Sequence, residues 1–277
     1  MTTRRADGVA TIVRDLWTSR ELIDQLVRRD VRLRYRQAVM GFAWALLMPA
    51  LTIAAGLVIK GALARGGGET PSLAGIALKS WAWAFFAGAM NFATMSLLSN
   101  ISLVTKIWFP EVLRSAPCWR SVSTFLRGPG HPRPDRAAAR HDLGWSILWL
   151  PVLLLLLLSF TTGLAFLFAC ANIFFRDVKY ILQVLLTFGI FFTPVLMEPS
   201  QMGRYAELVM MNPLSPILEG LRLAVTAGHN LLTPLDINGA VAWRPWWLGY
   251  SGDLVGHAAW AGLALLPRQC RAFAEAY

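Results

Sequence analysis

Residues that could do chemistry are few in this sequence and lie far apart. Asp253 and His257 are four positions apart and could meet on one face of a helix. A lone pair of this kind serves packing or hydrogen bonding more often than catalysis, which needs several acids, bases or metal ligands converging on one surface. No metal site is predicted, because none of the histidines lies at metal-ligand spacing from another. The histidines are His131, His141, His229 and His257.

Cysteine and nucleotide chemistry are not predicted either. The three cysteines, Cys118, Cys170 and Cys270, are odd in number and widely scattered, so neither a disulfide framework nor a metal centre is indicated. The sequence contains no G-x-x-x-x-G-K-[ST] loop, which is the backbone cradle for nucleotide phosphates. If the protein uses ATP, the nucleotide site must lie on a separate chain.

Charge is most concentrated in a run of arginines that directly precedes apolar sequence. Residues 28–49 read RRDVRLRYRQAVMGFAWALLMP. This pattern predicts a helix lying in the membrane interface, within a cytoplasmic segment of residues 1–40. Short basic flanks stay in the cytoplasm, so the amino terminus is expected inside. The arginines that fall on one arc of a helical wheel are Arg28, Arg29, Arg32 and Arg36.

Composition places the chain in a membrane. Of its 277 residues, 56% are hydrophobic and only 15% are charged, whereas a soluble domain carries charge on about 25% of its residues. The net charge of +10 fits cytoplasmic basic flanks and anionic lipid better than nucleic acid. We therefore expect an all-α polytopic protein with a transmembrane domain over residues 41–266 and a cytoplasmic tail over 267–277. Spans are predicted near residues 41–59, 80–104, 148–171, 180–197 and 246–266.

The segments between the spans have their own signals. Residues 60–79 are predicted as an outer loop. Residues 198–247 are of mixed polarity, but Ser215 and Pro216 suit the N-cap and first position of a helix that stops at Gly228. At about 16 Å this helix is too short to cross the bilayer, which favours a re-entrant helix. Glu219 and Arg222 lie three apart on it, and Gly189 and Pro194 are expected to break the preceding span.

The number of spans conflicts with the position of the ends. Both ends are expected in the cytoplasm, which requires an even number of crossings, yet five spans are predicted. The missing crossing belongs near residues 113–142. Residues 127–142 read RGPGHPRPDRAAARHD, with no aliphatic side chain larger than alanine. They cannot cross, because each arginine at the bilayer centre costs about 2.5–3.5 kcal/mol even on the lenient insertion scale.

Five stretches of the chain resemble the membrane (permease) subunit of type-2 ABC exporters. The similarity is greatest to the branch that exports lipid-linked polysaccharides such as O-antigen, capsule or teichoic acid, and it extends along nearly the whole chain. It implies six spans, an amino-terminal interfacial helix on the cytoplasmic side and re-entrant helices between the fifth and sixth spans. The matching stretches are RRDVRLRYRQAVMGFAWALLMP, NISLVTKIWFPEVL, NIFFRDVKYILQ, FFTPVLM and NPLSPILEGLRLAV.

The resemblance also implies partners and roles for residues. It implies two permeases over two ATPase subunits in the bacterial plasma (inner) membrane, with ATP and Mg held by the ATPases and no cofactor on this chain. Candidates for contact with the ATPase are Arg28, Arg29, Arg32, Arg36, Lys106, Phe109, Glu111, Arg176 and Asp177. Candidates for the translocation path, where aromatic faces would stack on sugar rings, are Trp44, Trp81, Trp83, Phe85 and Phe86. Candidates on the re-entrant helix are Asn212, Pro213, Glu219 and Arg222.

Other interpretations of these features remain open. The basic stretches also suit ordinary cytoplasmic flanks of membrane spans, and the tryptophans suit belts at the membrane interface. The same general fold could export a drug or a small lipid. A membrane-embedded transferase acting on lipid-linked glycans is less favoured, because it would need the converging catalytic groups that this sequence lacks.

The anomalous stretch leads to a first prediction. Residues 113–142 stand where the exporter family carries an apolar third span, and we attribute them to a pair of compensating frameshifts or to an error in the gene sequence. Resequencing the gene is expected to recover an apolar reading frame here. An intact frame encoding these same residues would contradict the hypothesis, and the protein would then be a damaged or inactive permease.

Overall fold

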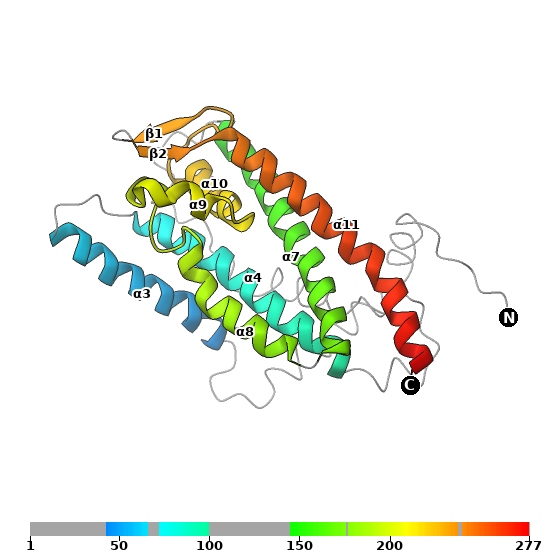
Figure 1. The fold of residues 1–277 in the computed structure, drawn as a ribbon. Helices are drawn as coiled ribbons and strands as arrows, with labels where there is room; N and C mark the ends of the chain where they lie inside the picture. Colours follow the sequence, from blue (N-terminus) through cyan, green and yellow to red (C-terminus); the bar gives the residue numbers. More distant parts are fainter. Residues whose placement is uncertain (1–42, 66–71, 100–144, 176, 238–239, 277) are drawn as a thin grey trace.

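A computed structural model describes residues 43–65, 72–99, 145–175, 177–237 and 240–276 of the chain. Long helices lie side by side, and short helices and a β-hairpin gather at one end of them (Figure 1). The predicted interfacial helix of residues 1–40 and the anomalous residues 113–142 lie outside the described residues.

Five longer helices make up most of the described structure. A short 3-10 turn, η3 (Trp145–Leu148), leads into the helix that begins at Trp149. The predicted helical membrane architecture is confirmed, whereas the six-span plan stays a prediction. The long helices are α3 (Ala43–Arg65), α4 (Leu73–Ser99), α7 (Trp149–Phe174), α8 (Val178–Gly189) and α11 (Pro245–Ala276).

The segment between α8 and α11 is built of short elements. They are η4 (Ile190–Phe192), η5 (Pro199–Gln201), η6 (Gly203–Tyr205), α9 (Ala206–Met210), α10 (Leu214–Thr226), β1 (Leu235–Ile237) and β2 (Ala240–Trp243). The two strands pair antiparallel, with Asp236 opposite Val241 and an irregularity in the register at Leu235. The predicted all-α fold is therefore wrong in one detail, because these two short strands form a β-hairpin. We call the end of the bundle that holds it the hairpin end (Figure 1).

Contacts at both ends show that α4 and α7 run in the same direction. At the hairpin end, α10 packs on both helices, because a Cβ on Gly220 would lie 3.1 Å from Leu153 of α7 and Glu219 reaches Lys79 of α4. At the other end, Nδ2 of Asn172 donates to a carbonyl oxygen of α4, 2.9 Å away. The last residue of α4 and the first residue of η3 therefore lie at opposite ends of the bundle (Figure 1).

The return from α7 to the hairpin end is made by α8 and the turns that follow it. A Cβ on Gly189, the last residue of α8, would lie 2.9 Å from the ring of Trp83. The chain then turns through Thr193 and Pro194, both buried. The backbone N–H of Ser72 donates to Oε1 of Glu198 over 3.1 Å, which places residue 198 beside the start of α4. The predicted break near Gly189 and Pro194 is confirmed.

Two helices among the described residues are long and apolar enough to cross a membrane. They are Leu73–Met95 within α4 and Trp149–Asn172 within α7. A third crossing is possible if the pair Gly203–Met210 and Leu214–Thr226, bent by 112°, forms one broken span. Residues Ala50–Ala62 and Val178–Phe192 form shorter apolar helices.

Several helix boundaries differ from the predicted ones. The outer loop predicted over residues 60–79 is wrong in its bounds, because α3 continues to Arg65 and α4 begins at Leu73. Lys79 suggested a loop, but its charge is paired inside the protein. The span predicted to continue to residue 197 is α-helical only to Gly189, and the 3-10 turn η4 extends it to Phe192 before further turns. Helix α11 continues to Ala276, through residues predicted as a separate tail.

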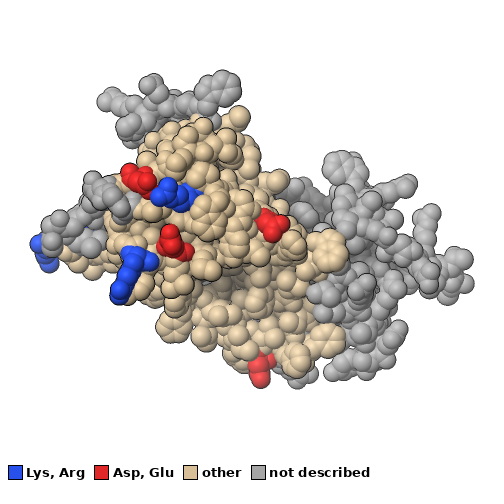
Figure 2. All heavy atoms as spheres, turned by 45° about the horizontal axis from the view of Figure 1, so that its top comes forward, with Lys and Arg blue, Asp and Glu red and all other residues tan. Residues whose placement is uncertain are grey.

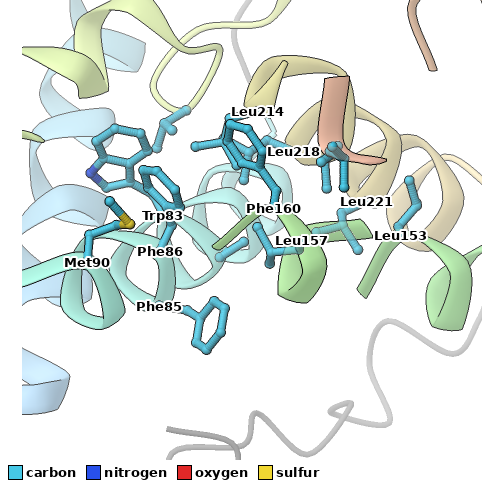
Figure 3. Close-up of a cluster of buried hydrophobic side chains, with 14 of the residues drawn as sticks. Trp83, Phe85, Phe86, Met90, Leu153, Leu157, Phe160, Leu214, Leu218 and Leu221 are labelled. Carbon is cyan, nitrogen blue, oxygen red and sulfur yellow. The ribbon is translucent and has the colours of Figure 1, made fainter. Parts of the chain in front are cut away.

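Helices α4, α7 and α10 supply most of the buried apolar core, and α8, α9, α11 and β2 each add side chains to it. Phe86 of α4 and Phe160 of α7 stack with their ring centroids 5.9 Å apart, and leucines of α10 complete the cluster (Figure 3). The surface in Figure 2 is mostly uncharged, with few acidic and basic side chains on it. In lipid such helices associate by close packing, since apolar burial by itself offers little gain there.

The closest helix packing, between α7 and α11, gives the second prediction. A Cβ on Gly163 would lie 2.6 Å from the backbone of Ala258, and one on Gly262 would lie 2.6 Å from the carbonyl oxygen of Gly163. Because backbone cannot move aside as a side chain can, we expect Gly163→Ala to destabilise the protein by about 1–3 kcal/mol. Thermal unfolding of the detergent-purified protein measures the effect.

The matched control is the same substitution at Gly88 of α4. A Cβ there has no atom within 4 Å to meet. Because alanine favours the helix over glycine by about 0.5–1 kcal/mol, Gly88→Ala is expected to leave Tm unchanged or raise it slightly. Equal Tm values for the two variants would contradict the close packing of α7 on α11.

Candidate functional site

Helix α10 lies where the re-entrant helix was predicted, and an asparagine side chain binds its first residue. Oδ1 of Asn212 accepts the backbone N–H of Leu214 over 3.1 Å, and Pro213 is the N-cap residue. The sequence had suggested Ser215 as the N-cap residue. In the structure, Ser215 is instead buried in the first turn of the helix. The asparagine takes that role because its carbonyl oxygen is an acceptor two residues before an unsatisfied N–H.

Helix α10 is as short as predicted and is buried, while its re-entry into the membrane stays a prediction. Gly228 has a φ of +61°, the left-handed conformation that ends helices, and it confirms the predicted stop. The N–H of His229 then donates to the carbonyl oxygen of Leu223 over 3.0 Å. Every residue from Leu214 to Ala224 is buried, including one acidic and one basic residue.

The acidic and basic residues of α10 form the predicted pair. Nε of Arg222 donates to Oε1 of Glu219 over 2.7 Å. Nη2 of the same guanidinium lies 2.5 Å from that oxygen, as an ion pair without hydrogen-bond geometry. The Glu219 side chain has no exposed surface, so this carboxylate depends on protein partners.

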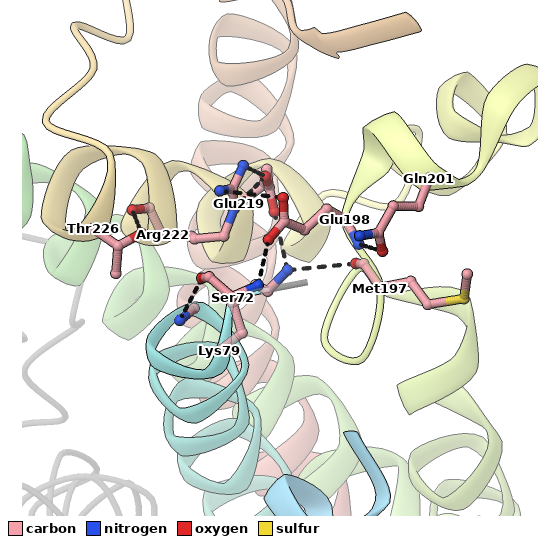
Figure 4. Close-up of polar contacts among 9 residues, drawn as sticks. Ser72, Lys79, Met197, Glu198, Gln201, Glu219, Arg222 and Thr226 are labelled. Atoms are coloured by element: carbon pink, nitrogen blue, oxygen red, sulfur yellow. Dashed lines mark hydrogen bonds and ion pairs between the residues drawn. The ribbon is translucent and has the colours of Figure 1, made fainter. Parts of the chain in front are cut away.

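A lysine from α4 neutralises the second carboxylate oxygen. Nζ of Lys79 lies 3.2 Å from Oε2 of Glu219, and the lysine side chain is only 1% exposed. The same Nζ donates to the carbonyl oxygen of Met197 over 3.4 Å. Figure 4 shows these side chains converging from α4, α10 and the segment before η5.

A second carboxylate balances the charge of the site. Oε2 of Glu198 lies 3.4 Å from Nη1 of Arg222, and Oε1 accepts the backbone N–H of Ser72. The side chain of Glu198 also caps η5, while its own N–H donates to Gln201. Lys79, Glu198, Glu219 and Arg222 therefore form a group of two cations and two anions, which we call the charge cluster.

A glycine of α4 makes room for the arginine. A Cβ on Gly75 would lie 2.8 Å from Cδ of Arg222 and 3.0 Å from its Cγ. The aliphatic part of the arginine therefore crosses the α4 backbone at a position where any larger residue would collide with it. This contact brings the guanidinium between the carboxylates of Glu219 and Glu198.

The chemistry of the charge cluster indicates a structural role and not a ligand-binding one. Each charged group is neutralised by a partner within the cluster, so it offers no unpaired group to a ligand. Removing one partner of a buried pair leaves an uncompensated charge, at a cost of about 3–5 kcal/mol. The cluster ties together residues 72–79, 197–201 and 219–222, which are far apart in the sequence.

The structure places only some of the other predicted site residues. Trp83, Phe85 and Phe86 are buried within the chain (Figure 3), and Trp81 is partly buried and packs against the same core. Their place in a translocation path stays a prediction. Asp177 is exposed just before α8. Outside the described residues or side chains are Arg28, Arg29, Arg32, Arg36, Trp44, Lys106, Phe109, Glu111 and Arg176.

Asp253 and His257 do meet on α11, as their spacing predicted. Nδ1 of His257 lies 3.7 Å from Oδ1 of Asp253, and both side chains are about three-quarters exposed, at 73% and 75%. In the described part of the chain, no three histidine, cysteine or acidic residues are placed to hold a metal ion. Among the described residues, no third acidic, histidine or cysteine side chain joins this pair in a metal-binding group, so the arrangement gives no support to a transferase.

The sequence missed two members of the cluster, Lys79 and Glu198. Lys79 is a single charge between the apolar stretches LAGIAL and SWAWAFF, and a lysine in that position is also typical of a loop next to a span. Its isolation within apolar sequence was the available signal, because such a charge requires a buried partner. Glu198 gave no comparable signal, since it lies in a mixed polar segment.

Comparison with known proteins gives the family to which the chain is similar. No family model matches it. It is 28% identical over 209 residues to the O-antigen export system permease protein RfbA of Myxococcus xanthus, covering 75% of this chain and 80% of the relative. It is 22% identical over 212 residues to the protein of the same name from Klebsiella pneumoniae, covering 72% and 77%.

The resemblance to O-antigen export permeases is confirmed. Both relatives are named as permeases, which are transport components rather than enzymes. The apolar helices of this chain agree with a membrane location.

The charge cluster gives the third prediction, on stability. Lys79→Met and Glu219→Gln each leave an unbalanced buried charge, so each is expected to cost about 3–5 kcal/mol. The double variant restores the balance, and its cost is expected to fall below the sum of the single costs by about 0.5–3 kcal/mol. Denaturation of the purified proteins in detergent measures this coupling.

An exposed ion pair at the hairpin provides the control. Arg244 and Asp236 lie 3.2 Å apart, with side chains 37% and 51% exposed. Because solvent screens such a pair, Asp236→Asn is expected to cost no more than about 1 kcal/mol. Additive effects of Lys79→Met and Glu219→Gln would show that the cluster does not act as a unit.

Proposed function

We propose that this chain is the membrane subunit of an ATP-driven ABC exporter that moves a lipid-linked, O-antigen-type polysaccharide out across the bacterial inner membrane. The observation that carries the proposal is its similarity to two O-antigen export permeases over about three-quarters of each chain. Long apolar helices and the short buried helix α10 support a transport role. The amino terminus lies in the cytoplasm in this proposal, as the arginine run before the first apolar segment indicates.

The proposal requires partners that supply energy and complete the path. The sequence has no phosphate-binding loop, so ATP and Mg are bound by a separate ATPase subunit. The permease acts as a homodimer, with the path between the two copies and lipid-linked glycan as its cargo. Aromatic faces give a weak grip that suits a polymer sliding past, and the ATPase meets the basic cytoplasmic segments.

Gene deletion in the native bacterium tests the proposal and is the fourth prediction. Loss of the permease is expected to leave lipid-linked glycan inside the cell and to remove it from the surface, because synthesis continues while export stops. Labelling of surface glycan and extraction of lipid-linked glycan measure the two pools. Unchanged surface glycan in the deletion strain would contradict the proposal.

Complementation makes the test specific to this chain. The wild-type gene and the Asp236→Asn variant should both restore surface glycan, since the hairpin pair is exposed. Lys79→Met, which unbalances the charge cluster, should restore little. Co-purification of the permease with an ATPase subunit distinguishes an ABC exporter from a transporter that works alone.

A further inference from the structure

Helix α11 exposes a polar pair on the side that faces away from α7. We propose that this exposed side, the α11 face, is a docking surface for a transmembrane helix of a different membrane protein. That helix carries a lysine or arginine near its centre, which pairs with the carboxylate of Asp253. The proposal requires that this chain spans a membrane and does not depend on what it exports. The exposed residues of the α11 face are Trp246, Tyr250, Asp253, His257 and Trp260.

The depth of the polar pair follows from the packing of α11 on α7. Both helices begin at the hairpin end and run side by side (Figure 1). A Cβ on Gly163 of α7 would lie 2.6 Å from the backbone of Ala258, and Gly163 is about 4 Å past the centre of the apolar span Trp149–Asn172. His257 directly precedes Ala258, and Asp253 lies one turn earlier. Both therefore lie within about 4 Å of the centre of that span.

The pair does not satisfy itself. Nδ1 of His257 donates to the backbone carbonyl oxygen of Asp253 over 2.9 Å, because a carbonyl oxygen can only accept. The carboxylate oxygen Oδ1 is 3.7 Å from Nδ1, beyond hydrogen-bond distance. Among the described residues, no lysine or arginine pairs with Asp253. Ionisable groups at this depth in membrane proteins face protein or a water-filled path and not lipid, so the α11 face requires a covering partner.

The spacing of the α11 face is that of a contact between helices. Trp246, Asp253 and Trp260 follow one another at intervals of seven residues, and so do Tyr250 and His257. The five residues fall within an arc of about 80° on a helical wheel. A seven-residue repeat keeps one set of side chains against a neighbouring helix when the two wind around each other with a left-handed twist. Lipid imposes no such interval, so the repeat favours a helix as the occupant.

Glycines beside Asp253 leave room for the backbone of that helix. A Cβ on Gly249 or Gly256 would have no atom within 4 Å, and these two glycines are also seven residues apart. Small residues let membrane helices approach closely enough for a polar side chain of one to reach the other. Gly163 and Gly262, by contrast, are already filled by the contact between α7 and α11.

Charge decides between a second copy of this chain and a different protein. Two copies with the same orientation in the membrane would bring the same residue of each α11 to the same depth. The two Asp253 carboxylates would then face each other and repel. A cation on the partner helix gives a charge-assisted hydrogen bond instead, which is the stronger kind. The complementary occupant is therefore a different helix with a basic residue near its centre.

Binding of synthetic membrane-spanning peptides tests the proposal and is the fifth prediction. The probe is a helix of about 23 leucine and alanine residues with one lysine at its centre. Matched peptides carry leucine or glutamate at that position. The full-length permease is reconstituted in phosphatidylcholine vesicles, whose surface has no net charge to attract the basic peptide. Energy transfer from the tryptophans of the permease to a dansyl group on the peptide measures binding.

The lysine peptide is expected to bind the wild-type permease about 3- to 20-fold more tightly than the leucine peptide, as polar contacts between membrane helices do. The glutamate peptide should show no such advantage. Asp253→Asn, which keeps the size and removes the charge, is expected to abolish the advantage of lysine. Asp236→Asn is the matched control, because it makes the same change at an exposed carboxylate outside the α11 face.

Two results of the peptide experiment would overturn the proposal. They are equal binding of the three peptides to the wild-type permease and an advantage of lysine that persists in Asp253→Asn. If Asp253→Asn does not fold, Gly256→Leu replaces it, because a larger side chain there fills the open space without changing any charge. Gly256→Leu is expected to weaken binding of the lysine peptide, and unchanged binding would contradict the docking surface.

Photo-crosslinking in the native bacterium then tests which molecule covers the α11 face. A photoreactive phenylalanine derivative replaces Trp260, or Leu155 of α7 as the control, since these side chains are 66% and 64% exposed. Position 260 is expected to link to a transmembrane segment of another protein that bears a lysine or arginine, and the link should be lost with Asp253→Asn. A link between two permease copies, a link within one chain, or no link would overturn the proposal. Neither readout measures export, so a failed export test leaves both results standing.

Discussion

A carboxylate without exposed surface can stay ionised only if cations lie against it, and Glu219 has one on each of its oxygens. The two cations come from different helices, so neutralising this one group brings α4 and α10 together. Arg222 needs more than one carboxylate oxygen for its guanidinium, and Glu198 supplies another. The arrangement of the hairpin end follows from satisfying these charges in apolar surroundings.

The helix directions are a second constraint, independent of the charges. Helices α4 and α7 run the same way, because α10 contacts the start of both and Asn172 bonds to α4 near the end of both. The chain therefore leaves α4 at one end of the bundle and enters η3 at the other. The basic flanks predict that both ends lie in the cytoplasm, which requires an even number of crossings and therefore also one more crossing between α4 and η3. The composition of residues 127–142 conflicts with both, which strengthens the hypothesis of an altered reading frame.

The proposed export function is consistent with how polar groups are distributed in this membrane protein. Charges within apolar helices are expensive in lipid, and the charges of Lys79, Glu219 and Arg222 are buried in balanced pairs. Trp83, Phe85 and Phe86 pack inside a single chain. If aromatic side chains line a path for sugars, either these side chains become accessible between two copies or others take that role.

The sequence by itself determined the membrane class, the resemblance to exporter permeases, the short helix that precedes Gly228 and its Glu219–Arg222 pair. These depend on composition and on local spacing, which a linear sequence displays directly. Only the tertiary structure decided that Lys79 and Glu198 complete the cluster, that Asn212 starts α10, and that α4 and α7 run in parallel. Lys79 and Glu219 are 140 residues apart, and no local rule relates them. Their contact arises because folding places both charges in apolar surroundings, where each needs a partner of opposite charge.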